Sequence, residues 1–85
     1  MHLHYTETFK TDYQYLPQEI QKQTERKLRL FLQNPRHPSL QVRKLQSDPT
    51  GKTWYGRITR GYRFTFQIEG EAYILLNVGK HEKIL

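Results

Sequence analysis

The chain has 85 residues, enough for one compact domain and too few for a second domain or a large internal cavity. We therefore expect residues 1–85 to form a single domain. Hydrophobic residues make up 35% of the sequence and charged residues 26%, which is typical of a folded domain and not of a disordered tail. Fourteen Lys and Arg against eight Asp and Glu give a net charge of +6, which favours a polyanionic partner such as RNA, DNA or an acidic protein segment.

Several classes of site and location are excluded by what the sequence lacks. Cysteine is absent, so neither disulfides nor thiolate metal sites are available. The sequence has no glycine-rich phosphate loop and no cluster of carboxylates, and His2 and His4 have no third ligand nearby, so we expect no cofactor and no metal. With no signal-peptide pattern and no apolar run of about 18 residues, we expect a cytoplasmic protein that does not contact membranes.

The first half of the chain predicts one strand and two helices. Alternation over residues 2–5 is typical of a short strand. Apolar side chains from Phe9 to Leu16 then recur at helical spacing and predict a first helix. Pro17 fits the first turn of a second helix, and Asn34-Pro35 should end it because the residue before proline is driven out of the α region.

The second half of the chain predicts strands joined by tight turns. Residues 41–45 have an extended pattern, which the turn residues 48–51 interrupt. Three more strands follow at 53–59, 62–69 and 72–78, and the two-residue spacers between them are typical of hairpins. The order β-α-α-β-β-β-β predicts an α+β fold, in which a curved antiparallel β-sheet packs against two N-terminal helices.

Positive charge gathers in the predicted strands. Between Arg43 and Arg63 there are six basic residues and a single acid, Asp48. Alternation turns Arg57 and Arg63 away from the core face, beside Tyr55, while the core face of the middle strand is assigned Tyr62, Phe64, Phe66 and Ile68. Two guanidinium groups on neighbouring strands suit a phosphate, because each binds phosphate oxygens in a two-point geometry. A solvated strand face on which the arginines serve solubility is the alternative interpretation.

A histidine follows the last predicted strand. His81 lies two residues past an apolar run and is flanked by Lys80 and Lys83. An imidazole at such a place can act as a general acid or base near neutral pH. An exposed histidine in a frayed tail is the alternative.

Taken together, these residues resemble the RelE/ParE superfamily of bacterial toxin–antitoxin toxins. The resemblance covers essentially the whole chain and rests on the order and spacing of short pieces, namely Phe9, Leu16-Pro17, Asn34-Pro35, His37 to Leu40, Lys44-Leu45, Trp54 with Arg57, Gly61-Tyr62-Arg63 and Val78 to His81. Members of this superfamily have a curved antiparallel sheet on two N-terminal helices, which agrees with the order predicted above.

The RelE-like branch of the superfamily implies an activity. Its members cleave messenger RNA, usually on the ribosome and without a metal, by attack of a 2′-hydroxyl on the adjacent phosphate to leave a 2′,3′-cyclic phosphate. By this resemblance Arg63 stabilises charge on the phosphate, Arg57 helps to hold it, and His81 donates or accepts a proton. The general base is not assigned. The residues expected to bind the RNA are Lys44, Tyr55, Lys80 and Lys83.

Two other functions remain open at this stage. A ParE-like protein has the same fold but binds DNA gyrase and carries no RNase site, and a catalytically degenerate member only binds RNA. Many RNase members also carry a tyrosine shortly after the residue that matches His81, where this sequence has Ile84-Leu85. The resemblance further implies a cognate antitoxin, and an acidic, partly disordered one would suit the positive charge.

Overall fold

The fold was taken from a computed structural model of the chain, which describes residues 1–84. Its helices and strands run in the order β1 (His2–Tyr5), α1 (Glu7–Gln14), α2 (Gln18–Gln33), the 3-10 turn η1 (Pro38–Leu40), β2 (Arg43–Lys44), β3 (Trp54–Thr59), β4 (Tyr62–Glu69), β5 (Ala72–Lys80) and α3 (His81–Ile84). The predicted α+β class is confirmed, and so is the predicted order of one strand, two helices and four further strands, between which the unpredicted η1 is inserted. The short α3 was not predicted.

Local signals account for where the two N-terminal helices begin and where α2 ends, although not all of these signals were predicted. The Thr6 hydroxyl accepts a hydrogen bond from the Phe9 amide at 3.2 Å, which caps α1, and donates to the Leu75 carbonyl at 2.7 Å, which ties the helix to β5. Pro17 is the residue directly before α2 and not, as predicted, part of its first turn. Asn34 follows the last residue of α2, as the following proline requires.

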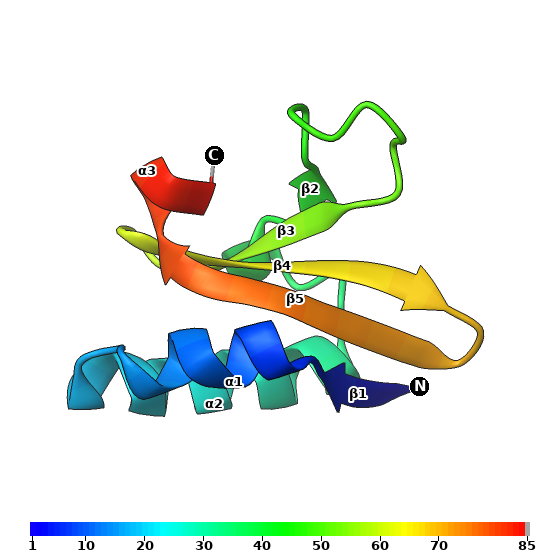
Figure 1. Ribbon diagram of the computed structural model, residues 1–85. Coiled ribbons are helices and arrows are strands. Elements are labelled where there is room, and N and C mark those ends of the chain that lie inside the picture. Colours follow the sequence, from blue (N-terminus) through cyan, green and yellow to red (C-terminus); the bar gives the residue numbers. More distant parts are fainter. Residues whose placement is uncertain (85) are drawn as a thin grey trace.

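The five strands form one mixed sheet in the order β1-β5-β4-β3-β2. β2 to β5 are antiparallel to their neighbours, whereas β1 is parallel to β5, so the prediction of a purely antiparallel sheet was wrong in this pair. The reason is topological, because α1 and α2 carry the chain from the β1 edge to the β2 edge, and the meander then returns β5 to β1 in the same direction. Figure 1 shows α1 and α2 on one side of the sheet and α3 on the other.

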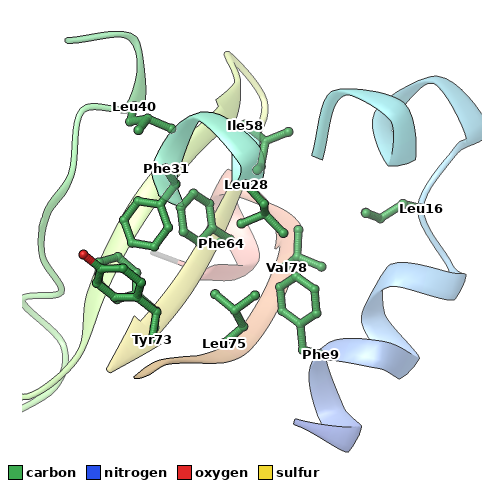
Figure 2. Close-up of a cluster of buried hydrophobic side chains, with 11 residues drawn as sticks. Phe9, Leu16, Leu28, Phe31, Leu40, Ile58, Phe64, Tyr73, Leu75 and Val78 are labelled. Atoms are coloured by element: carbon green, nitrogen blue, oxygen red, sulfur yellow. The ribbon is translucent and has the colours of Figure 1, made fainter. Parts of the chain in front are cut away.

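The core lies between α2 and the sheet. Figure 2 shows Phe31 of α2 against Phe64 and Tyr73, and its ring centroid is 5.3 Å from that of Phe64 and 4.4 Å from that of Tyr73. Gly56 of β3 has to be a glycine, because a Cβ atom there would come within 2.5 Å of the Phe64 ring. Packing of the aromatic rings against this strand therefore sets how α2 is seated on the sheet.

One residue assigned to the core is exposed. Ile68 shares the helix side of β4 with Phe66, but 54% of its surface is open to solvent. It lines a groove next to the loop that follows α2, because the helix ends at Gln33 before it reaches this end of the sheet.

The last strand is longer than predicted. β5 continues to Lys80 and does not end at Val78, and its ladder with β4 pairs Gly79 with Arg63. Among residues 1–84, no helix has the length and apolar character that crossing a bilayer requires.

The turn before β3 is held by one carboxylate, which leads to a prediction on acid stability. Asp48 accepts hydrogen bonds from the Thr50 amide (3.0 Å), the Thr50 hydroxyl (2.7 Å) and the Thr53 amide (3.0 Å). These bonds hold the pKa of Asp48 well below its usual range. The stability that Asp48 contributes is therefore complete above the unfolded-state pKa of about 3.9 and is lost as the pH falls from there toward the lower folded-state pKa.

We expect Asp48→Ala to lower the urea midpoint of unfolding at pH 6, and the difference from the original protein to shrink between about pH 4 and pH 2. Urea titrations at several pH values in this window measure the difference. A gap between the two proteins that stays constant down to pH 2 would show that Asp48 does not hold the turn through its charge.

Candidate nucleic-acid interface

Two arginines face each other on the side of the sheet that α1 and α2 leave open. In the ladder between β3 and β4, Arg57 pairs directly with Arg63. Directly paired residues of neighbouring strands point to the same side of a sheet, with Cβ atoms about 5 Å apart. The prediction that these two side chains leave the core face together is therefore confirmed. We call the surface formed by Arg43, Tyr55, Arg57 and Arg63 the arginine face. The strand pairing that puts Arg43 and Tyr55 on it is described below.

The β3–β4 hairpin fixes the guanidinium of Arg63. Its Nη1 atom donates to the carbonyl oxygens of Thr59 (2.6 Å), Arg60 (3.1 Å) and Tyr62 (3.0 Å). Partial burial, and then the charge of Arg57, lower the pKa of Arg63, although a guanidinium stays protonated at any usable pH. Among residues 1–84 no acceptor binds its Nε or Nη2 atoms, so part of the fork remains available to a ligand.

Within residues 1–84, no carboxylate forms an ion pair with Arg57 or Arg63. The single ion pair within residues 1–84 joins Lys10 to Glu7 of α1 at 3.6 Å, away from the arginines. Two arginines in direct register repel each other, and the one acid of β3 and β4, Glu69, lies at the opposite end of β4 from Arg63. A surface of this kind attracts an anion.

The pairing of β2 with β3 places Arg43 on the arginine face and Lys44 on the opposite side of the sheet. Arg43 pairs with Tyr55, and Tyr55 pairs with Thr65, so Arg43 and Tyr55 lie on the same side as Arg57. Lys44 pairs with Trp54 on the opposite side, where its Nζ lies 5.0 Å from the Trp54 ring centroid and donates to the Gly51 carbonyl at 2.9 Å. The structure therefore does not bring Lys44 to the arginine face. Arg43, which sequence reasoning missed, lies there.

The residues after β5 are only partly brought together with the arginines. Lys80 pairs with Tyr62, which places it on the helix side of the sheet. The amide of His81 donates to the Gly61 carbonyl at 2.8 Å, which ties the start of α3 to the β3–β4 hairpin next to Arg63. His81 and Lys83 are exposed on α3. Leu85 lies outside the described residues.

Metal-binding side chains do not gather in the described chain. Across residues 1–84 there is no group of three His, Asp or Glu side chains that could hold an ion.

The geometry can be compared with known proteins. No protein-family model and no curated protein matches the sequence. The arrangement of the sheet on two N-terminal helices is the RelE/ParE fold of toxin–antitoxin toxins. The chain resembles a YoeB/ParE toxin from Agrobacterium tumefaciens with a TM-score of 0.75 and 19% identity, over 95% of this chain and 99% of that one.

Two further structures with this fold come from RelE proteins. The isolated Escherichia coli RelE toxin has a TM-score of 0.68 and 26% identity, over 92% of this chain and 81% of that one. A RelB-RelE antitoxin-toxin complex from Methanococcus jannaschii has a TM-score of 0.72 and 17% identity, over 94% of this chain and 92% of that one.

Proposed function

We propose that this chain is the toxin of a toxin–antitoxin pair and that it cleaves messenger RNA on the ribosome. The observation that carries the proposal is the direct register of Arg57 and Arg63 on the open side of the sheet, with no ion pair to either side chain within residues 1–84. The resemblance to isolated RelE supports it, since this fold is used by toxins of that kind.

The reaction assigned to this site is an internal transfer at phosphorus. The 2′-hydroxyl oxygen bonds to the adjacent phosphorus as its proton leaves to a base, and the bond from phosphorus to the 5′-oxygen breaks. A 2′,3′-cyclic phosphate and a 5′-hydroxyl result. Arg57 and Arg63 stabilise the extra negative charge that the phosphate oxygens carry in the transition state. His81, tied to the same hairpin through its backbone, donates the proton that the 5′-oxygen needs.

The proposed partner is a cognate antitoxin. The Methanococcus jannaschii structure with this fold is a RelB-RelE antitoxin-toxin complex, and a chain of net charge +6 suits an acidic partner.

The test of the proposal is a translating extract that contains a defined messenger and the purified protein. We expect new RNA ends that depend on ribosomes and on added protein. An intact messenger would contradict the assignment as an RNase. A ParE-like inhibitor of gyrase is the second candidate, because the Glu82-Lys83-Ile84-Leu85 tail lacks the tyrosine of many RNase members. A supercoiling assay with purified gyrase separates the two, since the RNase proposal predicts unchanged supercoiling.

The role of His81 predicts a pH dependence. If its imidazole donates the proton, the cleavage rate should show an inflection with pH and fall on the alkaline side, because only a protonated group can donate a proton. His81→Gln should lower the rate by about 10²-fold or more and remove the inflection. Initial cleavage rates from pH 5.5 to 8.5 measure both. An inflection that persists in His81→Gln would assign it to another group.

A further inference from the structure

A hollow of about 420 Å³ adjoins the arginine face. Its walls include Thr65 and Gly79 from the sheet, Thr53 from the segment before β3, and Lys83 and Ile84 from α3. Thr65 is in register with Tyr55, and Gly79 is in register with Arg63, so the hollow and the arginine face are continuous. Its volume falls within the range of about 300–1,000 Å³ that small-molecule pockets have.

Thr65 carries an unused hydroxyl at this place. Only 4% of the residue is exposed, and its Oγ1 is the one buried side-chain oxygen or nitrogen within residues 1–84 that has no hydrogen-bond partner. Thr24, which is equally buried, donates its hydroxyl to the Ile20 carbonyl at 2.8 Å. A buried hydroxyl without a hydrogen-bond partner destabilises the folded chain. Valine has the same shape without this cost, so we infer that the Thr65 hydroxyl has a role in binding a ligand.

Gly79 leaves the hollow open beside the arginine pair. A Cβ atom built on Gly79 meets no atom within 4 Å. Paired strand positions are about 5 Å apart, so a phosphate on Arg63 brings its own nucleotide to the mouth of this space.

The walls offer a flat group apolar contacts, a hydrogen-bond acceptor and, from Lys83, a hydrogen-bond donor. Leu45 and Ile84 are apolar, and the Asp12 carboxylate stands at the far wall, where its Oδ2 accepts from the Asn77 side chain (3.0 Å) and the Val78 amide (3.1 Å). A carboxylate repels a phosphate but accepts hydrogen bonds from base N–H groups. The Tyr55 side chain stands next to Thr65 and offers a ring on which a base can stack.

We propose that this hollow binds one nucleobase of the RNA, that of the nucleotide whose phosphate lies on the arginine face, and that the Thr65 hydroxyl hydrogen-bonds to it. The oxygen is closed off in the free protein, so the side chain rotates about its Cα–Cβ bond as the base enters. This inference rests on the proposed function, since it describes how the same site reads its substrate.

The test compares two probes that cannot be cleaved. One is a ten-nucleotide 2′-O-methyl RNA, and the other is an abasic sugar–phosphate chain of the same length. We expect the full-length protein to bind the RNA at least about tenfold more tightly at low salt, as stacking and base contacts contribute. Gly79→Leu fills the hollow and should reduce this preference to nearly one, with binding to the abasic chain unchanged. Equal binding of both probes by the original protein would overturn the inference, and so would a full preference in a folded Gly79→Leu variant.

Two threonine variants test the hydroxyl itself. Thr65→Val should raise the urea midpoint of unfolding, because it removes an unpaired buried hydroxyl, and should lower the base preference. Thr24→Val, the matched control, should lower the midpoint and leave the preference unchanged. An undiminished preference in Thr65→Val would overturn the role of the hydroxyl.

These outcomes are separate from the fate of the proposed function. A protein that prefers bases but leaves the messenger intact would contradict the RNase proposal and support the base pocket. A protein that cleaves the messenger but binds both probes equally would support the RNase proposal and contradict the base pocket.

Discussion

Replacing Arg63 by alanine is expected to lower the cleavage rate by about 10²–10³-fold, which corresponds to about 2.7 kcal/mol or more of transition-state stabilisation. The reason is geometric. The hairpin carbonyls hold one end of the Arg63 guanidinium in place, so its remaining donors are positioned before a phosphate binds. A group that is already positioned does not have to reorganise during the reaction.

The same hydrogen bonds require a control for stability, because Arg63→Ala also removes three bonds from the β3–β4 hairpin. The unfolding midpoint of each variant should therefore be measured with its rate. Arg60→Ala is the matched control, since it removes one charge from the same turn and leaves the Arg57 pair intact. We expect it to cleave at nearly the original rate. Equal losses in the two variants would mean that Arg63 acts only through net charge.

Phe31→Ala is expected to destabilise the fold by about 3–5 kcal/mol, out of a total near 5–15 kcal/mol for a small domain. Phe31 has no solvent-exposed surface, and its ring contacts those of Phe64, Phe66 and Tyr73 at centroid distances of 5.3, 4.8 and 4.4 Å. Removing it leaves a cavity between α2 and three strand residues that cannot all move to fill it (Figure 2).

Urea unfolding monitored by the near-ultraviolet signal of the aromatic residues measures this loss. Phe31→Leu, which keeps most of the volume, should cost markedly less than the alanine variant. If the free energy of unfolding of Phe31→Ala lies within about 1 kcal/mol of that of the original protein, the core does not depend on this side chain in the way described.

Side-chain alternation along each strand predicts the arginine pair, because it turns Arg57 and Arg63 away from their core-facing neighbours. The two-residue spacer Arg60-Gly61 predicts the hairpin but not this pairing, since an unbroken ladder from Thr59 and Tyr62 would place Arg57 opposite Phe64. The ladder skips Ile58, and this bulge brings Arg57 opposite Arg63.

Other parts of the site depend on contacts between distant segments, which a local pattern does not contain. Arg43 and Lys44 are adjacent and chemically alike, and only their pairing with Tyr55 and Trp54 decides which of them lies on the arginine face. β1 pairs in parallel with β5, which lies about seventy positions further along the chain, and the pairing begins with His2 opposite Ala72. Lys80 continues the β5 ladder opposite Tyr62, and this turns its side chain away from the arginine face. No rule of spacing reveals these pairings, because tertiary pairing sets register.

The most direct test of the central claim is the chemistry of the RNA ends. Messenger cleaved in a translating extract should be mapped for its new 3′ ends in the presence of the original protein, Arg57→Ala and Arg63→Ala. We predict 2′,3′-cyclic phosphates with the original protein and a loss of these ends in both variants, because the two arginines act on one phosphate. New ends that carry 3′-hydroxyls, or cyclic phosphates that persist undiminished in folded variants of both arginines, would contradict the account.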